Sequence, residues 1–266
     1  MDLRLKDKVV LVTAASRGLG AASAHRFAAE GAQVAISARD KSHITQTALD
    51  IAKDTAARIF PIVGDVTKPE DADRTVQDVI DRFGRIDILI VNAGGPPAGP
   101  FKDMKWDQWE AAAHLVLLSA VRLCQAAIPH MLKNNPPDRG SIVAITSYVA
   151  RQPGDGLAIS NSLKISVVGL MKSLANEYAA QGIRVNSIAP GWTMTDRIKD
   201  IFRNRSERSG TSFDQEAAKV IAQIPIGRIA NPDEFADALV WLASPCASYV
   251  TGILLPVDGG LTQSYL

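Results

Sequence analysis

The chain has 266 residues, a formal net charge of +1, 47% hydrophobic residues and 21% charged residues. This composition is that of a globular protein with a large core, and the near-neutral charge gives no electrostatic case for binding nucleic acid or an anionic membrane. We therefore expect a small molecule as the partner. The two cysteines, Cys124 and Cys246, cannot form a disulfide framework or a thiolate metal cluster, and the scattered histidines predict no metal site.

The N-terminal segment, residues 1–8, alternates charged and apolar residues. A signal peptide needs an uninterrupted apolar core, and no run elsewhere looks long enough to span a bilayer. We expect a soluble, cytoplasmic protein.

Short β-branched runs alternate with longer segments of helical spacing along the chain. The predicted strands cover 9–12, 34–37, 60–63, 86–91, 142–145, 185–188 and 253–257. The predicted helices cover 21–30, 42–57, 69–83, 106–131, 159–180 and 232–243. This alternation predicts an α/β fold, a doubly wound parallel Rossmann sheet with helices on both faces, in a single domain over residues 1–266.

Two segments interrupt the alternation. Residues 94–100 are rich in glycine and proline, and residues 195–215 are polar and weakly patterned. Both follow strands, and ligands of open α/β sheets bind beyond the carboxyl ends of strands. We expect substrate loops at about 95–105 and 192–225, although ordinary surface loops are an equally good reading of single residues.

A glycine-containing turn joins the first strand to the first helix. Gly18 and Gly20 leave room for a pyrophosphate beside the backbone, and the helix N-terminus offers free N–H groups to it. The turn resembles the T-G-x-x-x-G-x-G turn of the short-chain dehydrogenase/reductase family, with Ala14 at the first glycine; a positive φ there would cost alanine about 1 kcal/mol. The candidate cofactor-binding residues of this turn are Ala14, Ser16, Arg17, Gly18, Leu19 and Gly20.

Charge after the second strand bears on the choice of cofactor. Arg39, together with Arg17, supplies guanidinium groups suited to a ribose 2′-phosphate, whereas an acidic residue would favour a free 2′-hydroxyl. The sequence therefore favours NADP over NAD, although Asp40 stands beside Arg39. The alternative is that Arg39 is a solvated charge.

Further motifs extend the resemblance from Lys6 to Gly260. By resemblance, residues 64–67 pack on the adenine ring, residues 92–94 support the sheet beside the ribose, and residues 190–195 hold the nicotinamide carboxamide. The cofactor-binding residues implied by these motifs are Asp65, Val66, Asn92, Ala93, Gly94, Pro190, Gly191, Thr193 and Thr195, and Lys164 joins them from a later helix.

The resemblance also implies a catalytic serine, a tyrosine thirteen residues later and a lysine four residues after that. Ser147 and Lys164 fit the first and last positions, but Ser160 stands where the tyrosine is implied. No other alignment restores it, because none of the four tyrosines has a lysine four residues later. The neighbouring long helix also carries Val116 where the family often has asparagine.

A serine hydroxyl is a weaker acid than a phenol, and the serine side chain is shorter by a ring. Ser160 therefore cannot place a proton donor where the tyrosine oxygen would lie. Three donors remain open: Lys164 acting through a water, a relay through Ser160 and Ser147, or Tyr148 turning inward. The fourth possibility is a site without catalysis.

The predicted function is an NADP(H)-dependent oxidoreductase that transfers hydride to or from a small or acyl-linked carbonyl or alcohol, with an altered proton donor. The alternatives are a catalytically silent NADP(H)-binding sensor or structural protein, and non-redox chemistry by Ser147 and Lys164. By resemblance, the helices at 106–131 and 156–180 and the segment 258–266 associate subunits, which predicts a homotetramer or dimer.

Overall fold

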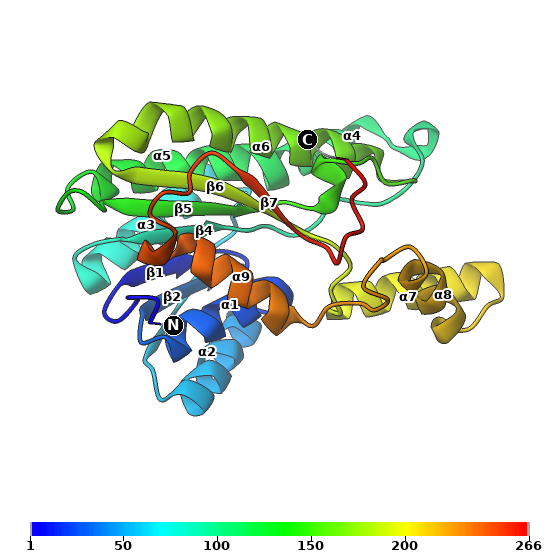
Figure 1. Ribbon diagram of the computed structural model, residues 1–266, viewed down its shortest axis with the longest axis horizontal. Coiled ribbons are helices and arrows are strands. Elements are labelled where there is room, and N and C mark those ends of the chain that lie inside the picture. The colour runs from blue at the N-terminus through cyan, green and yellow to red at the C-terminus, as the bar shows by residue number, and fades with distance from the viewer. Residues whose placement is uncertain (1, 265–266) are drawn as a thin grey trace.

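The strands of the computed structural model, which describes residues 2–264, form one parallel sheet (Figure 1). They are β1 (Val9–Val12), β2 (Gln33–Ala38), β3 (Ile59–Val63), β4 (Ile88–Val91), β5 (Gly140–Ile145), β6 (Ile183–Pro190) and β7 (Leu254–Val257). Within the described residues their order is β3-β2-β1-β4-β5-β6-β7, and every neighbouring pair is parallel. This confirms the doubly wound Rossmann fold and the single domain.

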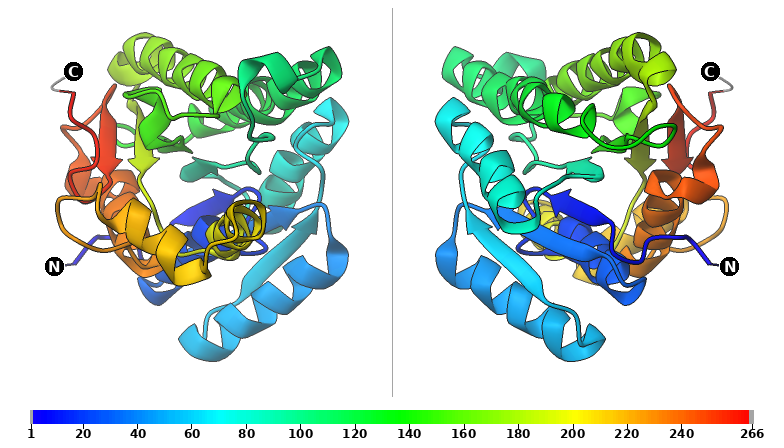
Figure 2. Two further views of the ribbon diagram at one scale, coloured as in Figure 1. Left: turned by 90° about the vertical axis from the view of Figure 1, so that its right-hand side faces the viewer. Right: turned by 90° about the vertical axis from the view of Figure 1, so that its left-hand side faces the viewer.

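Helices cover both faces of the sheet (Figure 2). The helices are α1 (Gly18–Ala29), α2 (Lys41–Thr55), α3 (Pro69–Phe83), α4 (Trp106–Ala113), α5 (Ser119–Met131), α6 (Ala158–Tyr178), α7 (Asp196–Ser209), α8 (Phe213–Ile221) and α9 (Pro232–Ala243). Short turns of other helix types are η1 (Phe101–Asp103), η2 (His114–Leu118), η3 (Tyr148–Ala150), η4 (Ala179–Gln181) and η5 (Pro245–Ala247). Helices α1, α2 and α9 contribute to the core on one face, and α3, α5 and α6 contribute to the core on the other.

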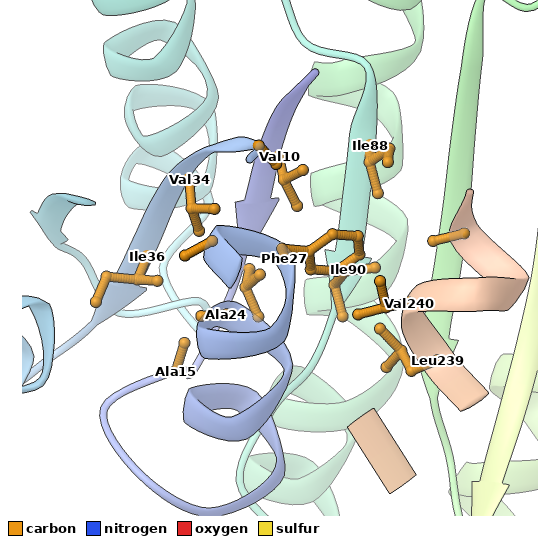
Figure 3. Close-up of a cluster of buried hydrophobic side chains, with 14 of the residues drawn as sticks. Val10, Ala15, Ala24, Phe27, Val34, Ile36, Ile88, Ile90, Leu239 and Val240 are labelled. Atoms are coloured by element: carbon orange, nitrogen blue, oxygen red, sulfur yellow. The ribbon is translucent and has the colours of Figure 1, made fainter. Parts of the chain in front are cut away.

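Successive strand residues alternate between the two cores, as β geometry requires. In β1, Val10 and Val12 belong to the core under α1 and α9, whereas Val9 and Leu11 belong to the opposite one. Phe27 of α1 is fully buried between β4 and α9 (Figure 3). Both faces of the central strands are therefore apolar, which explains their continuous β-branched runs.

The boundaries of two helices, α3 and α9, agree with those predicted from the sequence, because local signals mark their ends. Helix α3 starts at Pro69 and ends before Gly84, whose φ of 76° is left-handed. Helix α9 starts at Pro232 behind an Asn231–Glu234 capping box, and both helices have the predicted bounds. Proline at the first helical position and a left-handed glycine after the last one fix these ends.

The segment 195–215 departs from the prediction, because it is largely helical rather than irregular. Helices α7 and α8 lie beyond the end of the sheet (Figure 1), where Phe202, Val220 and Ile224 form a separate small core. Charged residues dominate α7, whose buried residue is Phe202, so little apolar signal marks this helix in the sequence. The prediction of irregular structure was wrong for this reason.

The long helical segment Trp106–Met131 is continuous but contains the π-helical turn η2. An 18-residue stretch within it has a mean hydropathy of 1.6, and the helix is long and apolar enough to cross a membrane by composition, so the prediction that no such run exists was wrong. The apolar side of α5, including Leu123 and Met131, is buried in the core against the sheet, which accounts for this hydropathy. Of the predicted association segment 258–266, residues 265–266 lie outside the described part of the chain.

Candidate active site

The strand order reverses between β1 and β4, and reciprocal hydrogen bonds join the residues that follow these two strands. The Thr13 hydroxyl donates to the Asn92 carbonyl at 2.7 Å and accepts from the Asn92 amide nitrogen at 2.9 Å. The Asn92 side chain then donates to the Ala14 carbonyl at 3.1 Å. Ala93 and Gly94 follow directly. In a doubly wound sheet this reversal is where a crevice for a nucleotide opens.

The turn after β1 restricts both of its glycines, Gly20 by close packing and Gly18 by its backbone conformation. A Cβ on Gly20 would lie 2.8 Å from the Ala14 carbonyl oxygen and 2.9 Å from Asn92 Nδ2, and Gly18 has a φ of 61°. Ala14 itself adopts a φ of 48°, so alanine occupies the left-handed region that the usual glycine would enter freely. The Ser16 carbonyl accepts from Thr47 at 2.8 Å, and Leu19 packs against the core. The turn presents bare backbone at the start of α1.

The two arginines proposed for phosphate recognition are both exposed. Within the described residues, neither Arg17 nor Arg39 forms an ion pair. Asp40, in contrast, caps α2: its carboxylate accepts from the His43 amide at 2.9 Å and the Ser42 hydroxyl at 2.7 Å. These hydrogen bonds hold the pKa of Asp40 below its usual value. The acidic residue beside Arg39 is thus committed to the helix N-terminus.

The segment after β3 forms an Asx turn. One oxygen of the Asp65 carboxylate accepts from the amide and hydroxyl of Thr67, at 3.0 and 2.8 Å. The Asp65 amide donates to Asp71 at 2.9 Å, and this bond contributes to lowering the pKa of Asp71. Val66 packs at the margin of the core. The turn thereby fixes Asp65 and Val66 at the carboxyl end of β3.

Lys164 is buried beneath the carboxyl end of β5. Its side chain donates to the Ile145 carbonyl at 3.2 Å, two residues before Ser147. Burial, aided by repulsion from Arg197, lowers the pKa of Lys164 to about 8. Ser147 precedes η3, and its hydroxyl accepts from the Val149 amide at 3.4 Å. Strand β5 and helix α6 therefore bring Ser147 and Lys164 to the same edge of the sheet.

Ser160 lies on the first turn of α6, one helical turn before Lys164. The residue is partly buried, and its hydroxyl has no hydrogen-bond partner among residues 2–264. The Tyr148 ring packs on Trp192, with centroids 6.5 Å apart, and burial raises the pKa of Tyr148. Val116 is buried in the π-helical turn η2, which packs on α6.

The segment after β6 lies over the phosphate turn. A Cβ on Gly18 would touch Thr195 at 3.5 Å, and a Cβ on Gly191 would lie only 2.7 Å from the Asp258 backbone. Pro190 ends β6. The Thr193 hydroxyl is buried and has no partner within the described chain. A buried hydroxyl of this kind calls for a ligand or water.

These observations fit a nicotinamide dinucleotide. The turn at Gly18 and Gly20 leaves its backbone bare, Arg17 and Arg39 are exposed without an ion pair in residues 2–264, and the Thr193 hydroxyl is buried without a partner there. For a metal ion, residues 2–264 contain no group of three or more suitable side chains. The site defines a dinucleotide-binding protein of the α/β class.

Sequence reasoning missed one side chain that the fold brings to this site. Arg197, in the first turn of α7, donates to the Pro96 carbonyl at 3.1 Å, and its guanidinium lies against the bare Cα of Gly95. The contact joins the two predicted substrate loops. A cation directly after the 190–195 motif was the available signal, but only the fold reveals its partner a hundred residues away.

Comparison with known proteins identifies the family. The family model described as enoyl-(acyl carrier protein) reductase matches residues 13–262. The chain is 36% identical to a 3-oxoacyl-acyl-carrier-protein reductase of Vibrio cholerae, covering 97% of this chain and 99% of the relative. It is 35% identical to 3beta-hydroxysteroid dehydrogenase 1 of Eggerthella lenta, covering 97% and 95%.

Among solved structures, L-sorbose reductase from Gluconobacter frateurii, complexed with NADPH and L-sorbose, superposes with a TM-score of 0.93. The two chains are 31% identical, and the match covers 99% of this chain and 100% of that one. The chain belongs to the short-chain dehydrogenase/reductase family. It is an oxidoreductase of this family. The relatives are dehydrogenases and reductases, so the comparison does not favour a silent cofactor-binding protein.

Proposed function

We propose that this oxidoreductase uses NADP(H) to transfer hydride to or from a small or acyl-linked carbonyl or alcohol, and that Lys164 supplies the proton in place of a phenol. The observation that carries the proposal is the burial of Lys164 at the end of β5, with a pKa of about 8. A general acid works best with a pKa near the working pH.

The cofactor, when bound, supplies or accepts the hydride. The residues of the chain then have separate tasks. The Ser147 hydroxyl, at the edge of the sheet beside η3, donates a hydrogen bond to the substrate oxygen. The Lys164 ammonium sends a proton toward that oxygen through a water in the volume that a phenol would otherwise fill, and Ser160 holds this water with its unpaired hydroxyl. In the oxidative direction the same groups take the proton back.

The preference for NADP rests on Arg17, Arg39 and the engagement of Asp40 with α2. An acidic residue whose oxygens already cap a helix does not compete for a ribose hydroxyl, whereas two unpaired guanidinium groups attract a 2′-phosphate. The G. frateurii reductase, which was solved with NADPH, supports the same choice.

The pH dependence of carbonyl reduction tests the role of Lys164. Protonated Lys164 is the donor, so the turnover number for reduction should fall as pH rises through about 8. A Lys164→Met variant should lose this inflection together with the activity. A wild-type profile that is flat from about pH 7 to 9 would contradict the proposal.

Restoring the phenol is the complementary experiment. Ser160→Tyr places a tyrosine four residues before Lys164 on one face of α6, and we expect turnover to rise at least about tenfold. Ser162→Tyr, at an exposed position of the same helix, is the matched control. NADPH binding without hydride transfer in the wild type, against a broad carbonyl panel, would instead establish a silent binder.

We also infer a cytoplasmic homo-oligomer, a tetramer or dimer, that acts on small molecules and binds neither nucleic acid nor membrane. Leu118 and Ile165 support an interface, because these large apolar side chains are 45% and 49% exposed on the long helical layer. Sedimentation analysis of the wild type and an Ile165→Glu variant tests the inference. A monomeric wild type would refute it.

A further inference from the structure

Arg197 links the loop after β4 to the start of α7. One nitrogen of its guanidinium donates to the Pro96 carbonyl at 3.1 Å. The same group lies so close to Gly95 that a Cβ there would overlap Nη1 and Cζ. The guanidinium plane therefore rests on bare backbone, and it remains accessible from solvent.

Its charge lacks a carboxylate partner in the described part of the chain. Among residues 2–264, no carboxylate forms an ion pair with Arg197, although Arg203 on the same helix pairs with Asp200 and Arg205 lies over the Trp192 ring. Lys164 is close enough for Arg197 to contribute to lowering its pKa, and partial burial lowers the pKa of Arg197 as well. Two cations that repel each other at the edge of the sheet favour an anion between or beside them.

The remaining guanidinium N–H groups suit such an anion. Arginine has five N–H donors in a fixed fork that matches a carboxylate or phosphate, and within residues 2–264 the guanidinium makes one hydrogen bond, to Pro96. The group contacts the predicted substrate loop at Gly95 and Pro96 and lies within electrostatic range of Lys164. Its position favours a ligand that lies against this loop.

We propose that Arg197 is a substrate-recognition residue that binds an anionic group, a carboxylate or a phosphate, placed close to the carbonyl or alcohol carbon that reacts. This rests on the proposed function. Oxo acids, or phosphorylated ketones and alcohols, are the substrate class that it predicts. The other possible source of the anion is the cofactor's own pyrophosphate, because Thr195, two residues earlier, packs beside Gly18 of the phosphate turn.

The test compares small 2-oxo and 3-oxo acids with their methyl esters in the presence of NADPH. The wild type should prefer the acids, and Arg197→Met should lower this acid-over-ester preference in kcat/KM by about 10- to 100-fold. Arg197→Lys should retain part of it, because a lysine keeps the charge but not the fork. Arg203→Met, at an exposed position of α7, is the matched control and should leave the preference unchanged.

Gly95→Ala is a second variant that keeps the charge. The added Cβ must displace the guanidinium, which is the far end of a flexible side chain, so the protein should fold normally while the acid preference falls. An equal preference in Gly95→Ala and wild type would overturn the proposed position of the group.

Binding measurements separate the two sources of the anion and keep the test independent of turnover. Calorimetry should detect 2-oxobutanoate or acetoacetate binding to the wild-type complex with NADP⁺, and Arg197→Met should lose it while NADP⁺ affinity changes less than about threefold. If Arg197→Met instead weakens the binding of NADP⁺ and reduces kcat/KM equally for acids and esters, the anion is the pyrophosphate and the proposal is overturned. Acid binding without turnover would retain this inference and refute the proposed hydride transfer.

Discussion

Lys164 should make the cofactor-free protein less stable than it would be with an apolar side chain. Its pKa falls from 10.5 to about 8 on folding, which corresponds to roughly 3 kcal/mol against the charged form. Lys164→Met removes this cost but also removes the hydrogen bond to the Ile145 carbonyl, worth about 1 kcal/mol. We expect the variant to be more stable by about 2 kcal/mol at pH 7.

The dependence on pH identifies the cause. Between pH 8 and 10.5 the unfolded lysine holds a proton that the folded one has released, so the stability contributed by this group rises with pH in that interval. The difference in unfolding free energy between variant and wild type should therefore be constant below about pH 8. It should decrease above that pH and nearly vanish by about pH 9.5. Other groups titrate alike in both proteins and cancel in the difference.

Urea denaturation without cofactor, at one protein concentration and at pH 7 and about pH 9.5, measures the difference in unfolding free energy between variant and wild type. Lys172→Met, at an exposed position of the same helix, is the control and should show neither effect. A Lys164→Met protein that is less stable than the wild type at pH 7, or a difference that does not change with pH, would refute the reasoning.

Three further predictions concern the cofactor site and the core. Arg39→Ala should weaken NADPH binding about tenfold and leave NADH binding unchanged, and equal losses for both cofactors would contradict its role at the 2′-phosphate. Gly20→Ala should cost about 1–3 kcal/mol of stability in urea denaturation and weaken NADPH binding in fluorescence titration, because its Cβ would press on the Ala14 carbonyl at 2.8 Å. Arg184 is buried and donates to the carbonyls of Ala243 and Ser244 at 2.9 Å, so Arg184→Met should lose about 3 kcal/mol by the same denaturation assay. A loss below about 1 kcal/mol would show that these carbonyls find other donors.

The sequence predicted the layers of the fold because the sheet is buried on both faces. Strands β1 and β4 are unbroken apolar runs. Pro69, Gly84 and Pro232 mark helix ends by local backbone preferences that need no distant contact. Helix α7 ends before the left-handed Gly210 and so carries the same end signal, but charged residues dominate its composition. Its one fully buried side chain, Phe202, packs on Trp192 and Phe213 outside the helix, so the helix itself carries little apolar signal.

The candidate site was predictable only in part. Ser147, Ser160 and Lys164 are fixed by spacing along one strand and one helix, and the sequence alone shows that the phenol is missing. The pKa of Lys164 depends on burial under β5, and the position of Arg197 depends on the absence of a side chain at Gly95. Both are properties of the assembled fold that no local pattern encodes.

The π-helical turn His114–Leu118 sets how α4 and α5 face their surroundings. It holds one residue more than an α-helical turn would, and each α-helical residue rotates side-chain direction by about 100°. Deleting one residue there would make the backbone regular, yet it would rotate every side chain of α4 around the helix axis, including Trp109, whose ring contacts Phe101 in the predicted substrate loop. The length of this helix is therefore constrained by the direction in which its side chains must point. Insertions and deletions of one residue should be selected against, even where the new sequence is a better helix former.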